Sequence, residues 1–300
     1  MSARTTHVAT VHFRSPDWID IQLRYLTRFL DTPHRTYAFL DDVPGDHAHK
    51  FFYASSEGVE SHAAKLNLLA DVIRFAAARP SDIVMFIDGD AFPVAPLSPL
   101  LARRLDRHKL IAVQRTENNG DIQPHPCFCI TTIGFWNEIG GDWHSGHEWL
   151  DLQGRPVTDV GGNLLGLLER RGVDWYPLRR LNTRDTHPLL FGVYGDAECG
   201  AVAYHHGQGF RRGLGGRVTI ALNDERRVRA SIRSRALNRL PLHGPLGAVR
   251  ARYSPVDRLH ARLAEESTAL SEAVMFRIRS DDRFWTDFAP ESSSAWAEHR

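Results

Sequence analysis

An unbroken apolar run that stops at two aspartates is the feature that most limits how this chain can fold. Residues Ile83 to Ile87 are all apolar, and three of them are β-branched. A short run of this kind, placed after a helical pattern and a Pro-Ser-Asp turn, predicts a strand buried on both faces, as in a parallel sheet. The run ends at Asp88-Gly89-Asp90, and ligands of open α/β sheets bind at the carboxyl ends of strands. Two carboxylates there can hold Mn²⁺ or Mg²⁺, and Gly89 allows the backbone bend and the close approach of a ligand.

The chain before this strand has the pattern of a doubly wound sheet. Residues 6–13 alternate in polarity and are rich in β-branched types, which predicts a first strand. Residues 19–30 carry apolar side chains at helical spacing, and residues 36–40 are typical of a second strand. A strand, a helix and a strand of these lengths form a βαβ unit. We therefore expect an α/β fold with a Rossmann-like, mostly parallel sheet flanked by helices.

Composition limits the classes of protein to consider. The chain has 300 residues, 42% of them hydrophobic and 24% charged, as in a globular soluble protein. Its three cysteines form no disulfide framework, and we expect Cys127 and Cys129 to be small buried hydrophobes in a reducing compartment. No charged-then-apolar leader and no apolar stretch of about 20 residues is present, so we expect a cytoplasmic protein. The net charge of +1 gives no field that would attract nucleic acid.

The Asp88-Gly89-Asp90 stretch, in its setting FIDGDAFPV, resembles the DxD motif of the GT-A-fold glycosyltransferases. In that family the carboxylates hold a metal against the diphosphate of a nucleotide-sugar donor, and one of them also contacts the donor ribose. The resemblance implies that Asp88 and Asp90 are metal ligands and that Asp88 and Gly89 lie at the donor. The alternative is a turn with two solvated aspartates.

Residues before the motif are further candidates for donor binding. Thr10 and His12 end the first predicted strand, where members of the family line the nucleotide-base pocket; strand-end polarity explains them equally well. Lys65 lies in the first turns of a helix that Ser61 is predicted to cap, and a helix N-terminus already favours anions. Members of the family contact the donor here with Lys or Arg, and an ordinary solvated lysine is the alternative.

A second motif follows another predicted strand. His206, Gly209 and Arg212 are spaced as His-x-x-Gly-x-x-Arg. An imidazole at a strand end can add a metal ligand, and glycine N–H groups with arginine can bind phosphate. The spacing is similar to the His-x-x-Gly-x-x-Lys motif of retaining transferases related to glycogenin and to bacterial lipopolysaccharide galactosyltransferases, with Arg in place of Lys. It implies His206 as a metal ligand and Arg211 or Arg212 at the diphosphate; the choice between His205 and His206 stays open.

The middle of the chain supplies candidates for the acceptor side. His125 opens a strand whose place in the chain resembles a segment near the acceptor in these transferases. Trp143 and Glu148 lie in a Trp- and His-rich patch, where indole faces can stack on sugars and carboxylates can accept hydroxyl hydrogen bonds; core packing is the competing explanation for Trp. Asp159 precedes a predicted helix, where it is either a simple N-cap or the base that an inverting transferase needs.

The resemblance covers residues 6–213 and sets the expected domains. We expect a catalytic domain at 1–215, with a nucleotide-sugar-binding half at 1–115 and an acceptor half at 116–215. Residues 216–300 are expected to form an Arg-rich, mainly helical extension. A basic amphipathic helix within 217–262 can contact an anionic membrane from the cytoplasmic side, whereas a solvated helical face is the alternative.

These observations predict a metal-dependent glycosyltransferase of hexosyltransferase type. It would move a sugar from a nucleotide-diphosphate-sugar donor to a hydroxyl of a glycan, a lipid-linked acceptor or a small molecule. The sequence names neither the sugar, the base nor the acceptor, and it leaves the stereochemistry open. One rival is a haloacid-dehalogenase-type phosphatase, in which the first aspartate is a nucleophile. The other is a catalytically silent protein that binds nucleotide-sugars.

Overall fold

The strands of the main sheet all belong to one compact unit of the chain. The computed structural model describes residues 4–76, 79–118, 120–182, 191–207 and 271–287, with short pieces at 239, 244–246, 253–255 and 269. Described residues up to 182, together with 191–207 and 282–287, belong to one compact unit, and 271–281 belong to a second. The predicted boundary near residue 215 and most of the stretch 217–262 lie outside the described residues.

A ten-stranded sheet organises the first unit, in the order β3-β2-β1-β4-β7-β6-β10-β11-β12-β5. Its strands are β1 (Thr6–Phe13), β2 (His34–Asp41), β3 (Tyr53–Ser55), β4 (Ile83–Asp88), β5 (Ala91–Pro93), β6 (Leu110–Val113), β7 (His125–Thr132), β10 (Tyr176–Arg180), β11 (Gly192–Asp196) and β12 (Gly200–His205). A separate two-stranded ribbon pairs β8 (Trp149–Leu150) with β9 (Pro156–Val157).

Most strands of the sheet point the same way. The pairings place β1, β2, β3, β4, β6, β10 and β12 in one direction and β5, β7 and β11 in the other. The first four strands in space, from β3 to β4, are parallel throughout. The predicted α/β class with a mainly parallel sheet is therefore confirmed, and the carboxyl ends of β1, β4 and β12 face one edge.

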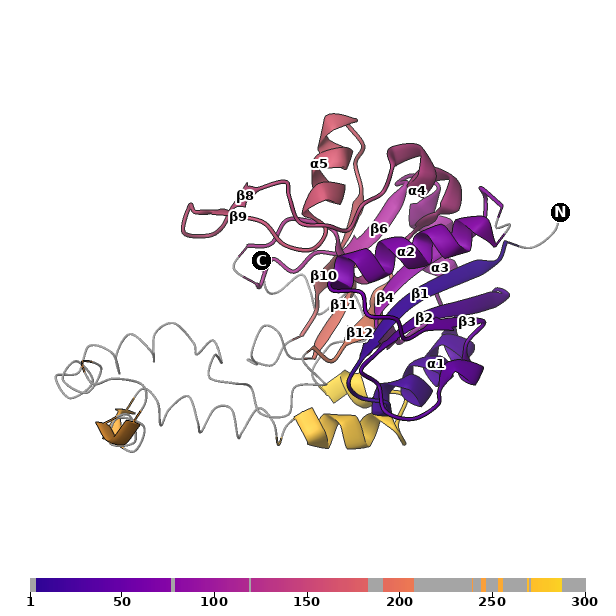
Figure 1. Cartoon of the computed structure of the whole chain (residues 1–300). Helices are drawn as coiled ribbons and strands as arrows, with labels where there is room; N and C mark the ends of the chain where they lie inside the picture. The colour runs from indigo at the N-terminus through magenta and orange to yellow at the C-terminus, as the bar shows by residue number, and fades with distance from the viewer. Residues whose placement is uncertain are drawn as a thin grey trace. The chain divides into compact units, whose positions relative to one another are not determined.

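Helices cover both faces of the sheet (Figure 1). They are α1 (Asp17–Phe29), α2 (His62–Phe75), the short α3 (Ser98–Leu100), α4 (Ile133–Ile139) and α5 (Gly162–Arg170), with short turns η1 (Ala48–Lys50), η2 (Leu101–Leu105) and η3 (Phe284–Asp287). Residues of α2, α4 and α5 pack in one core cluster, and residues of α1, α3 and η2 pack in the other. None of the helices among the described residues has the length and apolar character that a membrane span requires.

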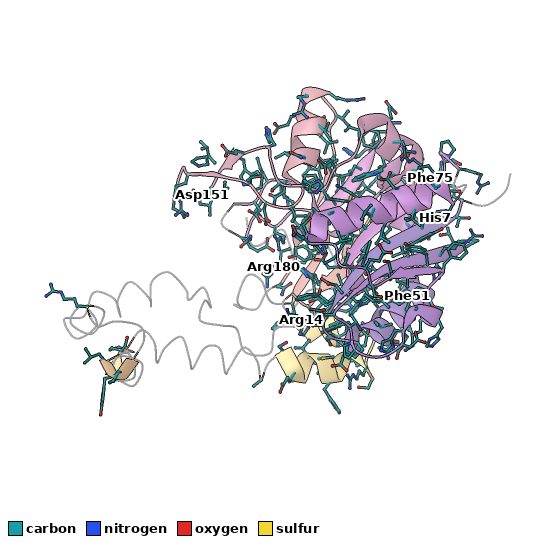
Figure 2. The ribbon with its side chains drawn as sticks, viewed as in Figure 1. His7, Arg14, Phe51, Phe75, Asp151 and Arg180 are labelled. Atoms are coloured by element: carbon teal, nitrogen blue, oxygen red, sulfur yellow. The ribbon has the colours of Figure 1, made fainter. Side chains whose placement is uncertain are left out.

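The apolar run from Ile83 to Ile87 forms the centre of this core. These residues are all buried and alternate between the two clusters, as a strand covered on both faces requires. β1 pairs with the whole of β4, so β4 ends beside Val11, two residues before the end of β1. Figure 2 shows His7 and Arg14 at opposite ends of β1, and the candidate site lies at the Arg14 end.

The chain returns to the first unit near its C-terminus. Phe284 is buried and packs edge-on against Tyr204 at a ring distance of 4.7 Å. Asp282 forms an ion pair with Arg28 at 2.5 Å. An aromatic anchor and an ion pair therefore hold residues 282–287 against α1 and β12.

Candidate functional site

Two strand ends meet where β4 stops. The chain leaves β4 at Asp88, turns through Gly89 and Asp90, and enters β5, which runs antiparallel to β12. This pairing sets Ala91 opposite His205, and the carbonyl of Asp90 accepts a hydrogen bond from the His206 N–H at 3.0 Å. β4, in the middle of the sheet order, and β12, next to its last strand, thus contribute side chains to one place.

The two aspartates of the motif converge on a histidine. His205 Nε2 lies 3.3 Å from Asp90 Oδ1 and 3.5 Å from Asp88 Oδ2. The ligand atoms of Asp88, Asp90 and His205 all lie within 4.8 Å of one another. Two carboxylates and an imidazole are a donor set that suits a divalent cation of the Mn²⁺ kind. These residues therefore fit the cation that the motif implies.

His206, the predicted ligand, points elsewhere. Its side chain is buried, its Nδ1 is hydrogen-bonded to the Tyr204 hydroxyl at 2.8 Å, and its ring packs on Trp18 at 4.6 Å. Burial lowers the pKa of His206 to about 4, so it is a neutral core residue. Successive strand residues face opposite sides, so the register differs by one residue from the prediction and His205 takes the place expected of His206.

The charges in the Asp88–Asp90–His205 cluster favour a cation between the carboxylates. Burial raises the pKa of Asp88, but the hydrogen bond and charge of His62, and then the charge of His205, outweigh burial and lower that pKa overall. Burial lowers the pKa of His205, but the charge of Asp90 outweighs it, and the pKa lies well above its usual value. A protonated imidazole thus balances the carboxylates, and a metal would displace that proton.

Gly89 is required by its neighbours in β1. A Cβ atom at this position would lie 2.6 Å from the Val11 carbonyl oxygen and 2.8 Å from His12 Nδ1. His12 itself is buried beneath the turn, and burial lowers its pKa to about 4. The sequence suggested Gly89 for a backbone bend and a ligand, but the structure adds a contact with β1 as its reason. His12 lies under the motif as a neutral ring.

Gln22 of α1 holds the turn and was missed by the sequence argument. Its Nε2 donates to the carbonyl oxygens of Asp88 at 2.7 Å and Ala91 at 2.8 Å, while its Oε1 accepts from the Thr10 hydroxyl at 3.0 Å. The side chain is fully buried. Thr10, predicted to bind the donor, is therefore a support for Gln22. A polar residue on the apolar face of α1, in line with Trp18, was the signal that could have identified it.

α2 places His62 against Asp88, and Lys65 one turn further along. Its N-cap is Ser61, as predicted, because the Ser61 hydroxyl oxygen accepts from the Ala64 N–H. His62, the first helical residue, lies with Nε2 3.0 Å from Asp88 Oδ1 and was not identified from the sequence. Lys65 is buried and forms an ion pair with Asp41 at 2.5 Å. The ammonium of Lys65 is thus already paired, whereas His62 faces the motif directly.

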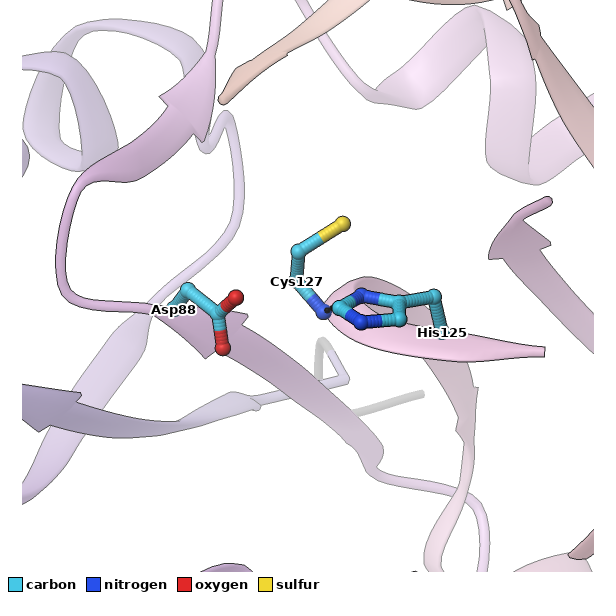
Figure 3. A group of neighbouring side chains, drawn as sticks. All are labelled: Asp88, His125 and Cys127. Carbon is cyan, nitrogen blue, oxygen red and sulfur yellow. Dashed lines mark hydrogen bonds between the residues drawn. The ribbon is translucent and has the colours of Figure 1, made fainter. Parts of the chain in front are cut away.

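β7 brings two more candidate ligands to Asp88. The ligand atoms of Asp88, His125 and Cys127 lie within 4.8 Å of one another (Figure 3). His125, expected on the acceptor side, is buried, and its ring is stacked on the His205 ring at 6.5 Å. It therefore lies beside the metal candidates. Cys127 is fully buried, as the sequence predicted.

The remaining candidate residues do not gather at the Asp88–Asp90–His205 cluster or lie outside the described residues. Trp143 is fully buried against Phe86 at 5.1 Å and offers no indole face for a sugar, so core packing, the competing explanation, holds. Glu148 is exposed. Asp159 does not cap α5, whose N-cap is Gly161. Gly209, Arg211 and Arg212 lie outside the described residues.

Asp159 belongs to a second charged cluster. Its Oδ2 lies 3.5 Å from Nη2 of Arg115, which lies at the same distance from Asp121 Oδ2. Its Oδ1 accepts from the Val160 N–H at 2.8 Å. Arg115 follows β6 and its side chain is largely buried, so a fixed cation already compensates these carboxylates.

Comparison with known proteins gives distant similarities only. No protein-family model and no curated protein matches the chain. Among solved structures, it is similar to S. aureus TarS 1–349 in complex with UDP-GlcNAc, with 12% identity and a TM-score of 0.35 over 47% of this chain and 48% of that one. The chain thus spans about half the length of that TarS fragment.

Two further solved structures are similar at the same level. One is 4-diphosphocytidyl-2C-methyl-D-erythritol synthase, with 12% identity and a TM-score of 0.35 over 59% of this chain and 88% of that one. The other is the glycosyltransferase GlyE of Streptococcus pneumoniae TIGR4, with 14% identity and a TM-score of 0.34 over 58% and 41%. At these TM-scores the similarities assign no activity, which is therefore inferred from the chain's own residues.

Proposed function

We propose that this protein is a metal-dependent glycosyltransferase of GT-A type, which transfers a sugar from a nucleotide-diphosphate-sugar to an acceptor hydroxyl. The observation that carries the proposal is the convergence of Asp88, Asp90 and His205 within 4.8 Å at the carboxyl end of a buried parallel strand. Ligands of open α/β sheets bind at that edge. His205 replaces His206 as the proposed third ligand.

In this proposal a bound cation would supply Lewis-acid stabilisation of the negative charge on the departing nucleotide diphosphate. Asp88, Asp90 and His205 would hold it. Gln22 fixes the turn between the two aspartates through two carbonyl oxygens, so the carboxylates keep one geometry. Arg211 and Arg212, which follow β12 in the sequence, remain the proposed partners of the diphosphate.

Asp159 remains the proposed base for an inverting reaction. Its carboxylate is partly exposed, so Oδ2 can take a proton from an acceptor hydroxyl. The segment that carries Asp159 approaches the start of β7, whose first residue, His125, lies beside His205. A Cβ at Gly161 would lie 2.2 Å from the carbonyl oxygen of Pro124, the residue directly before β7. Arg115 would hold the charged form in place.

A thermal-shift panel of nucleotide-sugars with Mn²⁺ tests the proposal. A ligand that binds only the folded state raises the melting temperature. We expect one nucleoside diphosphate, and its sugar conjugate, to stabilise the protein with Mn²⁺ and to lose that effect in excess chelator. Equal stabilisation in chelator would contradict the metal site.

Turnover assays separate the proposal from its rivals. Acceptor-dependent release of nucleotide diphosphate is the expected result for a glycosyltransferase. Phosphate release from a phosphomonoester would instead indicate the phosphatase, in which Asp88 would be a nucleophile. Binding without turnover across acceptors would indicate a silent binding protein.

A further inference from the structure

A bulge in β7 re-aims one of its two cysteines. On β6, Ala112 lies opposite Cys129, but the next residue, Val113, lies opposite His125. The register therefore shifts: between Cys129 and His125, β7 has extra residues where β6 advances by one, as in a β-bulge. Bulges of this kind change where a side chain points and occur next to functional sites.

The core contacts show the result of this shift. In a regular strand, residues two apart share a face. Cys129 nevertheless packs with α2, α4 and α5, whereas Cys127 packs with the cluster on the opposite face, as does its neighbour Phe128. The Cys127 thiol is thereby brought to the end of β4, within 4.8 Å of an Asp88 oxygen. Asp88 also belongs to the Asp88–Asp90–His205 group, so the thiol lies next to a ligand of that group.

His125 holds the bulge. The Cys127 N–H donates to His125 Nδ1 at 3.0 Å, across two residues. A ring nitrogen that accepts a hydrogen bond is unprotonated, so the neutral ring carries its proton on Nε2. Neither nitrogen then offers a lone pair to a metal without breaking this bond. His125 is accordingly a positioning residue, and the thiol is the extra ligand that β7 can supply.

We infer that the Cys127 thiolate is an additional ligand at the Asp88–Asp90–His205 site, so that thiophilic divalent cations such as Zn²⁺ and Cd²⁺ bind there through sulfur. The inference rests on the metal site of the proposed function and extends it to the class of cation. Carboxylates suit Mg²⁺ and Mn²⁺, whereas thiolate selects softer ions. On coordination the S–H bond breaks, sulfur gives its electron pair to the cation, and the proton leaves to solvent.

Cadmium titration of the metal-stripped full-length protein, without nucleotide, tests this inference. A thiolate–Cd²⁺ bond gives a sulfur-to-metal charge-transfer band in the ultraviolet. We expect the band in the wild-type protein and in Cys129→Ser, and its loss in Cys127→Ser. Cys129 is the matched control because it lies on the same strand and is equally buried, but faces the other cluster.

The affinities supply a second measurement. Most sites with nitrogen and oxygen ligands also bind Zn²⁺ more tightly than Mn²⁺, so a preference alone is not diagnostic. The change on removal of sulfur is diagnostic. We expect Cys127→Ser to weaken Cd²⁺ and Zn²⁺ binding by more than about 100-fold, since loss of even an outer-shell partner costs about 10- to 100-fold. Mn²⁺ binding should stay nearly unchanged.

Three results would overturn the inference: a wild-type protein that binds Cd²⁺ without the band, a band that survives in Cys127→Ser, or equal loss of Cd²⁺ and Mn²⁺ affinity in that variant. If Cys127→Ser does not fold, Asp90→Asn replaces it as the test. A wild-type band that needs a higher Cd²⁺ concentration in Asp90→Asn supports the inference, and a band that is unchanged in Asp90→Asn contradicts it. The test also stands apart from the proposed function. A band without nucleotide-sugar binding contradicts only the transferase, and Mn²⁺-dependent donor binding without a band contradicts only the thiolate.

Discussion

The two ends of β4 carry aspartates with opposite roles. Asp82, before the strand, is 4% exposed and accepts hydrogen bonds from the Thr5 N–H, the Arg79 N–H and the Arg79 guanidinium. Asp88, at the other end, faces the imidazoles of His62 and His205. The hydrogen bonds to Asp82 come from backbone N–H groups and a guanidinium, which cannot bind a metal, and its one imidazole neighbour, His7, is 3.8 Å away. The groups that face Asp88 are imidazoles, which can themselves bind a metal. A satisfied carboxylate stabilises the fold, whereas one among potential ligands is free to bind.

The largest effect should come from removing charge at the carboxyl end. Asp90→Asn keeps the size of the side chain but loses the charge that holds the cation. We expect Mn²⁺ affinity, measured by calorimetry, to fall by more than about 100-fold and transfer to be abolished, with little change in melting temperature. Asp82→Asn is the control, and it should lower the melting temperature without affecting Mn²⁺ binding. Tight Mn²⁺ binding by Asp90→Asn would remove the contrast between the two ends.

The two adjacent histidines sharpen the same contrast. His205→Ala removes a proposed ligand, and we expect Mn²⁺ affinity to fall about 10- to 100-fold. His206→Ala removes a buried ring and its bond to Tyr204, so we expect a loss of about 1–3 kcal/mol of unfolding free energy with Mn²⁺ affinity retained. Denaturant unfolding and calorimetry on both variants measure these effects. The reverse pattern would restore His206 as the ligand.

Gln22→Met tests whether the turn at the carboxyl end must be held rigid. Met fills a similar volume but cannot donate to the Asp88 and Ala91 carbonyl oxygens. We expect a loss of about 1–3 kcal/mol of unfolding free energy and roughly tenfold weaker Mn²⁺ binding, because two buried acceptors lose their partner and the carboxylates lose their fixed spacing. Thr10→Val leaves both donated bonds in place and should lower only stability. Unchanged Mn²⁺ affinity in Gln22→Met would show that the turn keeps its geometry without the Gln22 hydrogen bonds.

The smallest effect concerns pH and the amino end of β4. Burial raises the pKa of Asp82, but the hydrogen bonds from Arg79 and Thr5 outweigh burial and lower it to about 2, against a usual value of 3.8. A carboxylate with a lowered folded pKa stabilises the protein above its unfolded pKa and loses that contribution as the pH falls through the folded value. The stability difference between the wild type and Asp82→Asn should therefore be constant above about pH 5 and shrink between about pH 4 and 2. Urea unfolding across this range measures it, and a pH-independent difference would contradict the assignment.

Local patterns predicted the strands well, and long-range pairing decided the site. β1 matches its predicted bounds, and β4 extends one residue beyond the predicted run, because alternation and an apolar run are local signals. The choice between His205 and His206 depends on how β12 pairs with β5, which no local pattern contains. The β7 bulge depends likewise on pairing with β6. The sequence therefore predicted that Cys127 is buried, but not which face of the sheet its side chain is on.

The pairing of β5 with β12 also sets the order in which the site can form. β4 and β5 are separated by only two residues, but β12 lies more than one hundred residues further along the chain. Closing a loop of that length costs conformational entropy before any contact repays it, and such contacts form late in folding. The aspartates of β4 therefore gain their histidine only when most of the first unit is assembled. The proposed metal centre is therefore completed only by the same strand pairing that completes this edge of the sheet, which couples cation binding to the folded state.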